Sequence, residues 1–274
     1  MPKTILITGA TDGIGLETAR KLSAHGHELL VHGRSAEKLS RTLADLRAMP
    51  DAGPVAGYRA DLSDLSQVAG LAQAVLAEHK CIDVLINNAG VLKTEQPTTA
   101  DGRDVRFVVN TLAPALLTRL LLPAIPQDGR VLHLSSAAQA SVDLAGLSGQ
   151  RVFQPMDAYA QSKLALTMWS QALASERGKE GPVTVAVNPG SLLATNMVRK
   201  GFGVAGNDIG IGADILVRAA LTEDFSDASG LYFDNDAGRF APPHADAAQA
   251  ATVARVVAAI EKEIETYLRE AGDA

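Results

Sequence analysis

The chain has 274 residues, a formal net charge of −6 and a single cysteine, Cys81. This length fits one large α/β domain as well as two small ones, and about three-quarters of the unfolded surface can be buried without disulfides. The negative charge argues against general nucleic-acid binding, and no CxxC pair or His/Cys cluster indicates a metal site. One cysteine cannot form an internal disulfide, so we expect a reducing, cytoplasmic compartment. The first three residues lead directly into an apolar run, so we expect no signal peptide.

Short apolar runs alternate with amphipathic stretches along the whole chain, and this alternation predicts an α/β fold. We expect a single domain over 1–274, a Rossmann-type, doubly wound parallel sheet of about seven strands with helices on both faces. The predicted strands span about 4–8, 28–32, 55–59, 82–86, 130–135, 183–187 and 230–233. The predicted helices span about 13–25, 36–49, 65–79, 102–124, 157–178, 210–222 and 247–270.

A glycine-rich turn follows the first predicted strand and leads into the first predicted helix. Gly9 allows a tight turn, Gly13 lets the backbone approach a pyrophosphate, and Gly15 lets the helix pack close to the strand. The helix N-terminus then offers free N–H groups and a partial positive charge to phosphates. This pattern predicts a dinucleotide-binding βαβ unit, although its spacing, G-x-x-x-G-x-G, differs from the usual G-x-G-x-x-G.

The end of the second predicted strand indicates which dinucleotide is bound. NAD-binding units carry an acidic residue about 20 residues after the glycines, where it bonds the ribose 2′-hydroxyl. Gly33 and Arg34 stand at that place here. An acid would repel a 2′-phosphate, whereas arginine can hold one with two charge-assisted bonds, and Lys38 adds positive charge nearby. We therefore predict NADP(H) as the cofactor; a solvated loop charge is the alternative interpretation of Arg34.

Tyr159 and Lys163 stand four residues apart in a predicted helix, so both side chains lie on one face, one turn apart. A fixed positive charge favours a phenolate, which makes this tyrosine a candidate acid/base. A solvated helix face produces the same spacing, so the pair needs support from the rest of the chain.

Two other segments indicate whether the chain contacts a second subunit or a membrane. The last predicted helix, 247–270, has one apolar stripe and one charged side, which fits packing on the same chain or contact with a second subunit. The longest apolar stretches, such as 112–125, are too short to cross a membrane and are interrupted by Arg119 and proline. We therefore expect no membrane span.

These features together resemble the short-chain dehydrogenase/reductase family over essentially the whole chain. Segment 8–15 resembles the family's T-G-x-x-x-G-I-G cofactor motif, and 87–90 resembles its N-N-A-G motif. The resemblance implies four catalytic residues: Asn110, Ser136, Tyr159 and Lys163. It implies cofactor contacts at Gly9, Thr11, Asp12, Gly13, Ile14, Gly15, Arg34, Asp61, Leu62, Asn88, Ala89, Gly90, Tyr159, Lys163, Pro189, Gly190 and Thr195.

The same resemblance implies a mechanism. NADPH passes a hydride to a carbonyl carbon, Tyr159 gives a proton to the oxygen, and Ser136 holds that oxygen in place. Lys163 lowers the pKa of the tyrosine and bonds the nicotinamide ribose, and Asn110 holds a water that links Lys163 to solvent.

Within the family, the chain most resembles the members related to retinol dehydrogenases and protochlorophyllide reductases. Two features depart from the family pattern: the gap from Pro189 to Thr195 is one residue longer than expected, and 113–115 reads Ala-Pro-Ala where a small residue and then an aromatic are expected. The first departure weakens the assignment of Thr195.

The substrate side is predicted less sharply. A substrate loop is expected over about 191–210, with a glycine-rich stretch at 201–206 that fits either a flexible lid or a plain surface loop. A largely apolar pocket is expected, which suits a hydrophobic aldehyde, ketone or alcohol. The apolar residues expected around it are Leu144, Leu147, Val152, Phe153, Met156, Leu192, Leu193, Met197 and Phe202.

Family members often pair through the helices placed here at 102–124 and 157–178, so a homodimer or homotetramer is possible. Two other functions stay open beside the leading oxidoreductase: a non-catalytic NADPH-binding sensor or scaffold, and a sugar-nucleotide epimerase or dehydratase.

Overall fold

The computed structural model describes residues 1–272, apart from the side chains of Lys200 and Phe202. The described residues form an eight-stranded sheet with the order β3-β2-β1-β4-β5-β6-β7-β8. Every neighbouring pair is parallel except β7 and β8. The strands are β1 (Thr4–Ile7), β2 (Glu28–Gly33), β3 (Val55–Arg59), β4 (Val84–Asn87), β5 (Arg130–Leu134), β6 (Val183–Asn188), β7 (Tyr232–Asp234) and β8 (Arg239–Phe240). The predicted doubly wound fold is confirmed; the eighth strand was not predicted, because two residues show no periodicity.

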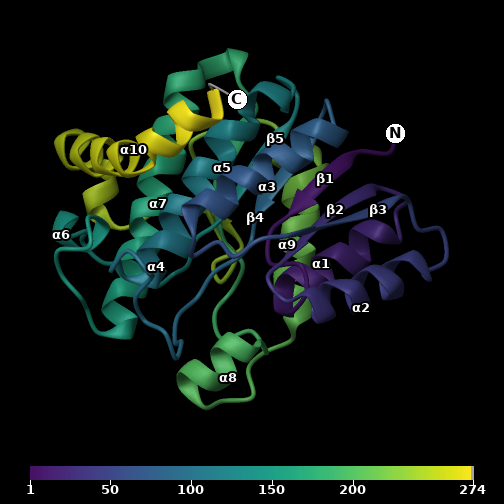
Figure 1. Cartoon of the computed structure of the whole chain (residues 1–274), viewed down its shortest axis with the longest axis horizontal. Helices are drawn as coiled ribbons and strands as arrows, with labels where there is room; N and C mark the ends of the chain where they lie inside the picture. The colour runs from purple at the N-terminus through teal and green to yellow at the C-terminus, as the bar shows by residue number, and fades with distance from the viewer. Residues whose placement is uncertain (273–274) are drawn as a thin grey trace.

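Helices cover both faces of this sheet (Figure 1). One layer holds α1, α2 and α9, and the other holds α3, α5, α7 and α10. The helices are α1 (Gly13–Ser23), α2 (Ala36–Arg47), α3 (Leu65–Glu78), α4 (Val105–Phe107), α5 (Ala113–Leu121), α6 (Leu144–Leu147), α7 (Pro155–Arg177), α8 (Asn196–Phe202), α9 (Ile209–Leu221) and α10 (Ala250–Gly272). Single turns η2 (Leu122–Ala124), η3 (Gly178–Glu180), η4 (Glu223–Phe225) and η5 (Ala245–Ala248) are 3₁₀, and η1 (Val108–Leu112) is a π-helix.

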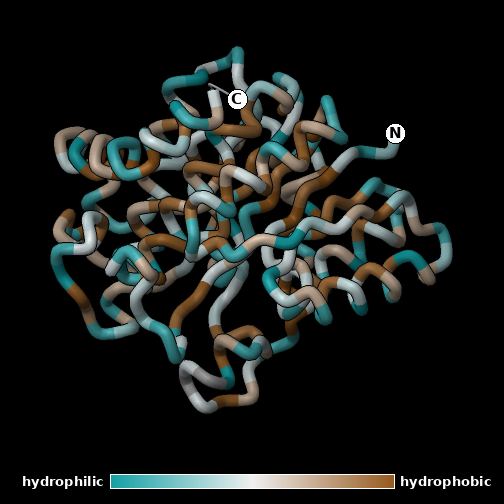
Figure 2. The backbone as a smooth tube through the Cα atoms, in the orientation of Figure 1, coloured by the Kyte–Doolittle hydropathy of each residue, from teal (hydrophilic) through white to brown (hydrophobic). Residues whose placement is uncertain are grey.

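The core follows from the period of two along each strand. Ile5 and Ile7 pack into the layer of α1, α2 and α9, whereas Leu6 between them packs into the opposite layer. Both faces are covered, so the strands are apolar nearly throughout, as the central hydrophobic segments in Figure 2 show. The strand order reverses between β1 and β4, and in such sheets ligands bind at the carboxyl ends of the strands beside this point.

The segment predicted as one helix over 102–124 is divided into α4, η1, α5 and η2. Within it, the 20 residues Val105–Ala124 are long and apolar enough to cross a membrane by length and composition, contrary to the expectation above. Burial gives the simpler physical account, because 72% of the most apolar window lies inside the structure, where the segment covers one face of the sheet.

The C-terminal helix α10 lies across α5, α7 and α3 of its own chain. Its buried stripe is Val256, Ile260 and Ile264. A polar contact fixes its orientation: the Glu261 carboxylate accepts bonds from the Trp169 indole (2.8 Å) and the Arg119 guanidinium (2.7 Å). The apolar stripe of α10 therefore packs on the same chain, against α5 and α7.

Candidate active site

The turn between β1 and α1 is held in shape by close backbone packing. Gly9 has a φ of +65°, and a Cβ there would stand 2.9 Å from the Cα of Ala89. A Cβ on Gly15 would stand 2.3 Å from the side-chain nitrogen of Asn88. Asp12 caps α1, and its carboxylate accepts the Gly13 N–H at 2.8 Å. The glycines thus have the roles that the sequence predicts for Gly9 and Gly15.

Asn88 and its neighbours connect β4 to this turn. The Asn88 amide donates to the carbonyls of Thr8 (2.8 Å) and Gly9 (3.2 Å), and the Thr8 hydroxyl accepts the Ala89 N–H (3.1 Å). Asn87 is buried, and its amide contacts Thr118 and His133 under the sheet. The N-N-A-G segment therefore braces the turn from one side.

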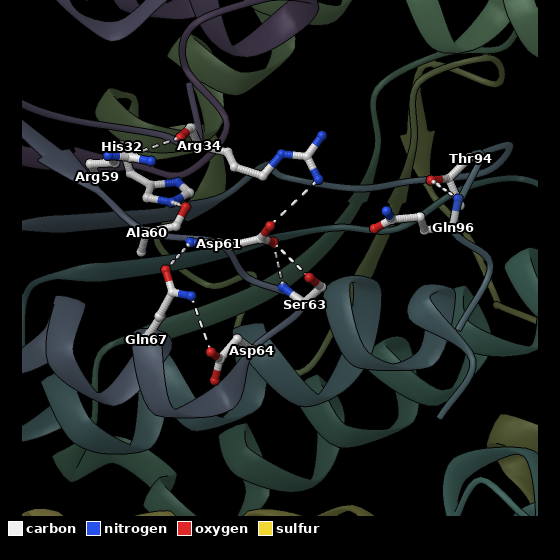
Figure 3. A network of polar contacts seen from close by, with 10 residues as sticks. All are labelled: His32, Arg34, Arg59, Ala60, Asp61, Ser63, Asp64, Gln67, Thr94 and Gln96. Atoms are coloured by element: carbon white, nitrogen blue, oxygen red, sulfur yellow. Dashed lines mark hydrogen bonds and ion pairs between the residues drawn. The ribbon is translucent and has the colours of Figure 1, made fainter. Parts of the chain in front are cut away.

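His32 braces the turn from the other side, a role that sequence reasoning missed. Its Nδ1 accepts the Gly9 N–H at 3.2 Å, so its Nε2 carries the proton and donates to the Ala60 carbonyl at 3.1 Å. The side chain is buried, and burial lowers its pKa to about 4. The neutral His32 ring therefore connects the glycine turn to the segment that precedes Asp61. Figure 3 shows this ring beside Ala60 and Asp61.

The outer end of the site carries exposed charges. The Arg34 guanidinium stands 3.6 Å from the Asp61 carboxylate, and its side chain is 75% exposed (Figure 3). Asp61 is itself held by the backbone N–H and hydroxyl of Ser63, at 3.0 and 2.7 Å. Lys38, the second predicted cation, pairs with Asp12 at 3.2 Å. Both cations are thus at the predicted edge, each beside a carboxylate.

Tyr159 and Lys163 lie one turn apart on α7, and the Lys163 ammonium is 5.6 Å from the centroid of the tyrosine ring. The ammonium donates to the Leu134 carbonyl at 2.6 Å, and burial lowers its pKa to about 8. Burial raises the pKa of Tyr159, and the Ser136 hydroxyl opposes that rise. Desolvation outweighs the Ser136 hydrogen bond, so the balance lies toward the protonated phenol. The expectation that Lys163 lowers the pKa of this tyrosine stays a prediction.

Asn110 lies in the π-helix η1 and is fully buried. Its amide oxygen accepts the Val91 N–H (2.8 Å), and its amide nitrogen donates to the Val91 carbonyl (3.0 Å) and the Ser162 hydroxyl (3.0 Å). A Cβ on Gly90 would stand 3.3 Å from this amide oxygen and 3.4 Å from the Lys163 ammonium. Asn110 and Lys163 therefore meet at Gly90, while the asparagine side chain holds the loop after β4.

A cleft of about 380 Å³ joins these groups, a volume within the usual range for small-molecule sites. Of the predicted residues, those that line it are Gly9, Thr11, Asp12, Gly13, Ile14, Arg34, Asp61, Leu62, Asn88, Ala89, Gly90, Tyr159, Lys163, Pro189 and Thr195. Gly15, Asn110, Ser136 and Gly190 are not part of this lining. Residues that sequence reasoning missed also line it: His32, Ala60, Val91, Val109, Leu134 and Ser135. Gly33 lines it as well, and so do Asn196 and Met197 of the predicted substrate loop.

The predicted substrate loop contains the short helix α8, which projects from the body of the molecule in Figure 1. Thr195 caps this helix by accepting the Val198 N–H at 3.2 Å, and its methyl lies 3.5 Å from a Cβ position on Gly13. The Asn196 amide donates to the Asp12 carboxylate at 2.6 Å. The start of α8 is therefore tied to the cap of α1, across the cleft mouth.

The predicted apolar pocket residues divide into three groups. Met197 lines the cleft. Leu144, Leu147 and Phe153 pack in the core, and Leu193 is also buried. Val152, Met156 and Leu192 are exposed, and the Phe202 side chain lies outside the described residues. The structure thus brings only part of the predicted set to the cleft.

Comparison with known proteins adds independent information. The model of the short chain dehydrogenase family matches residues 3–203. Retinol dehydrogenase 12 of Mus musculus is 34% identical over 245 residues, covering 85% of this chain and 78% of that protein. Retinol dehydrogenase 13 of Homo sapiens is 30% identical over 265 residues, covering 89% and 80%.

Solved structures agree with this. A Mycobacterium Paratuberculosis protein of 30% identity superposes with a TM-score of 0.77, covering 95% of this chain and 92% of that one. A short chain dehydrogenase of Shigella flexneri, crystallised with NADP, has 26% identity and a TM-score of 0.67, covering 85% and 97%.

Proposed function

The chain belongs to the short-chain dehydrogenase family, and we propose that it transfers a hydride between NADP(H) and a carbonyl or alcohol substrate. One observation carries the proposal. Tyr159 and Lys163 stand together in a cleft that also reaches the glycine turn and Arg34. A dinucleotide laid along this cleft would place its adenine end at Arg34 and its nicotinamide beside Tyr159.

The residues around the cleft fit the cofactor. The turn at Gly9 and Gly15 has no room for a side chain, so the backbone itself forms the cradle that phosphates need. When bound, the nicotinamide supplies or accepts the hydride. Pro189 and Thr195 line the cleft on the side where the sequence predicts that ring.

Tyr159 moves the proton in this proposal. Its raised pKa keeps the phenol protonated near neutral pH, which suits the donation of a proton to a carbonyl oxygen during reduction. The Ser136 hydroxyl, which acts on the same phenol, would hold that oxygen in place. The Lys163 ammonium supplies positive charge behind the ring.

We propose NADP(H) rather than NAD(H) on two grounds. Gly33 replaces the acid that would bond a ribose 2′-hydroxyl, and Arg34 lines the same end of the cleft. Similar enzymes of Shigella flexneri and Burkholderia cenocepacia were crystallised with NADP.

A hydrophobic carbonyl or alcohol is the proposed substrate. Relatives include the retinol dehydrogenases above and a polyprenol dehydrogenase of Mus musculus, 34% identical over 208 residues, and Met197 brings an apolar side chain to the cleft. A cytoplasmic location stays a prediction. A homodimer or homotetramer that pairs through the segments 102–124 and 157–178 also stays a prediction, and light scattering on eluted protein would test it.

The test is NADPH oxidation, followed by absorbance, with a panel of aldehydes and ketones from short to long apolar chains. Wild type should turn over at least one of them, and Tyr159→Phe should lose turnover while it still binds NADPH in a fluorescence titration. Full turnover by Tyr159→Phe would show that the proton donor is misassigned. NADPH binding with no turnover of any carbonyl or alcohol would favour the sensor or scaffold instead.

A further inference from the structure

The backbone carbonyl of Ser136 accepts two side-chain hydrogen bonds. The Tyr232 hydroxyl donates to it at 3.0 Å, and the Gln139 amide donates to it at 3.0 Å. Tyr232 begins β7 and is only 5% exposed. It lies 96 residues further along the chain than Ser136 and outside the segment 3–203 that the family model matches.

Gln139 is itself held from the C-terminal region. Its amide oxygen accepts the His244 N–H at 2.8 Å, so the amide nitrogen is left facing the Ser136 carbonyl. The Ser136 hydroxyl oxygen accepts the Ala138 N–H at 3.1 Å, which closes a tight turn. Tyr232 therefore bonds this short turn directly at the Ser136 carbonyl, and the His244 backbone bonds it through Gln139.

The sheet alone does not set the orientation of this serine. β5 ends at Leu134, and the bond from the Ser135 N–H to the Val187 carbonyl (2.8 Å) continues the ladder one residue further. Ser136 lies beyond that bond, where the chain leaves the sheet and its peptide plane could rotate. The two donors on its carbonyl hold that plane, and with it the direction of the hydroxyl.

We propose that Tyr232 and Gln139 are positioning residues that fix the Ser136 peptide so that its hydroxyl faces Tyr159; this rests on the function proposed above. Tyr232 acts as a neutral donor to the Ser136 carbonyl, and its hydroxyl is also hydrogen-bonded by the Gln139 side chain. Burial and then the carboxylates of Asp234 and Asp236 raise the pKa of its phenol, so it keeps its proton throughout the working pH range.

Tyr232→Phe is the sharpest variant, since it removes one oxygen and keeps the ring. Tyr58→Phe is its matched control: Tyr58 is 7% exposed, and its hydroxyl donates to Glu78 at 2.8 Å, away from the cleft. Both variants should lose similar stability in urea. Tyr232→Phe should lower kcat about three- to tenfold, the usual worth of one hydrogen bond, with unchanged NADPH binding. Tyr58→Phe should keep the wild-type kcat.

The pH profile separates positioning from simple loosening. In alcohol oxidation the rate rises with pH as Tyr159 ionises, and the Ser136 hydroxyl is what opposes the rise in the pKa of that phenol. Tyr232→Phe should therefore move the rising limb to higher pH, and Tyr58→Phe should not. Gln139→Met should act in the same way, and the double variant should lose more than the product of the two single losses, because the carbonyl is then left without either donor.

The inference fails if Tyr232→Phe keeps the wild-type kcat and pH limb, or if Tyr58→Phe changes them equally. Such a failure is distinct from failure of the proposed function. Wild-type turnover that Tyr159→Phe abolishes would uphold the function in either case, whereas absent wild-type turnover overturns both.

Discussion

The polar side chains at the two ends of the cleft differ in how far they are exposed to water. At the catalytic end Asn110 is fully buried and Lys163 is 3% exposed, so their surroundings set their chemistry. At the outer end the Arg34 side chain is 75% exposed and stands beside Asp61 in water. Buried charges respond strongly to desolvation, whereas exposed ones interact weakly and are screened by salt. Substitutions should therefore have large, salt-independent effects at one end and small, salt-dependent effects at the other.

Lys163→Met should give the largest effect. It removes the ammonium that donates to Leu134 and lies behind the Tyr159 ring, and kcat should fall roughly 10²- to 10⁴-fold, the usual range for loss of acid/base assistance. Steady-state rates at low and high salt measure it. Lys80→Met, at an exposed lysine, is the control and should be silent. A loss that shrinks at high salt would mean that the catalytic end is not sealed from water.

The pH dependence of stability tests whether burial itself causes the difference. Burial lowers the pKa of His32 to about 4 and that of His133 to about 3, below the ordinary 6.5. The unfolded chain then binds more protons below about pH 6.5, so the stabilisation is complete above that value and is lost as pH falls. Each histidine should cost about 2 kcal/mol of unfolding free energy between about pH 7 and pH 5.

Urea unfolding at several pH values measures this slope. His133→Asn and His32→Asn should each remove a large share of this slope, and His27, whose pKa burial also lowers, contributes to the remainder. Because the carboxylates with lowered pKa values lose their contribution only at lower pH, a flat stability over this window would contradict the burial of both histidines.

Arg34→Ala probes the exposed end and should have a smaller effect. NADPH should bind roughly tenfold more weakly while NADH is unchanged, because only NADPH carries the 2′-phosphate that a guanidinium can hold. The loss should shrink as salt is raised. Arg41→Ala, 70% exposed and paired with Glu37 on α2, is the matched control. Equal losses for both cofactors would remove the basis of the NADP(H) proposal.

The same contrast explains what the sequence could predict. The strands, most helices and the glycine turn depend on local periodicity and on spacing, and they were found within a few residues of their observed ends. That Tyr159 and Lys163 lie together could be predicted because they are neighbours on one helix.

What was missed depends on contacts between distant segments. His32 is hydrogen-bonded to Gly9 and Ala60, and Tyr232 is hydrogen-bonded to the Ser136 carbonyl. No local sequence pattern predicts either pairing. Burial raises the pKa of Tyr159, and the Y-x-x-x-K spacing could not predict this effect because burial is a property of the fold. The break at η1 was likewise hidden within an unbroken apolar run.

Asn196→Ala should give the smallest effect. It tests whether the start of α8 belongs with the exposed or with the buried end of the cleft. The Asn196 amide and the Lys38 ammonium both bond the Asp12 carboxylate, at 2.6 and 3.2 Å, and together with the Gly13 N–H they outweigh burial and lower its pKa. All three side chains are exposed, so the tie to α8 is weak, and its loss should raise KM for the carbonyl about two- to threefold with kcat unchanged.

Lys38→Ala is the control for that variant, since it removes the other partner of Asp12 without touching α8. If α8 closes the substrate side of the cleft, only Asn196→Ala should change the carbonyl KM. If both variants change the carbonyl KM alike, the effect instead comes from the altered Asp12 cap of α1. Helix α8 then contributes to the cofactor end of the cleft and not to the substrate side. A large change in kcat for Asn196→Ala would mean that this exposed contact affects Tyr159 and Lys163. We do not expect this, because Asn196 bonds Asp12 and neither Tyr159 nor Lys163.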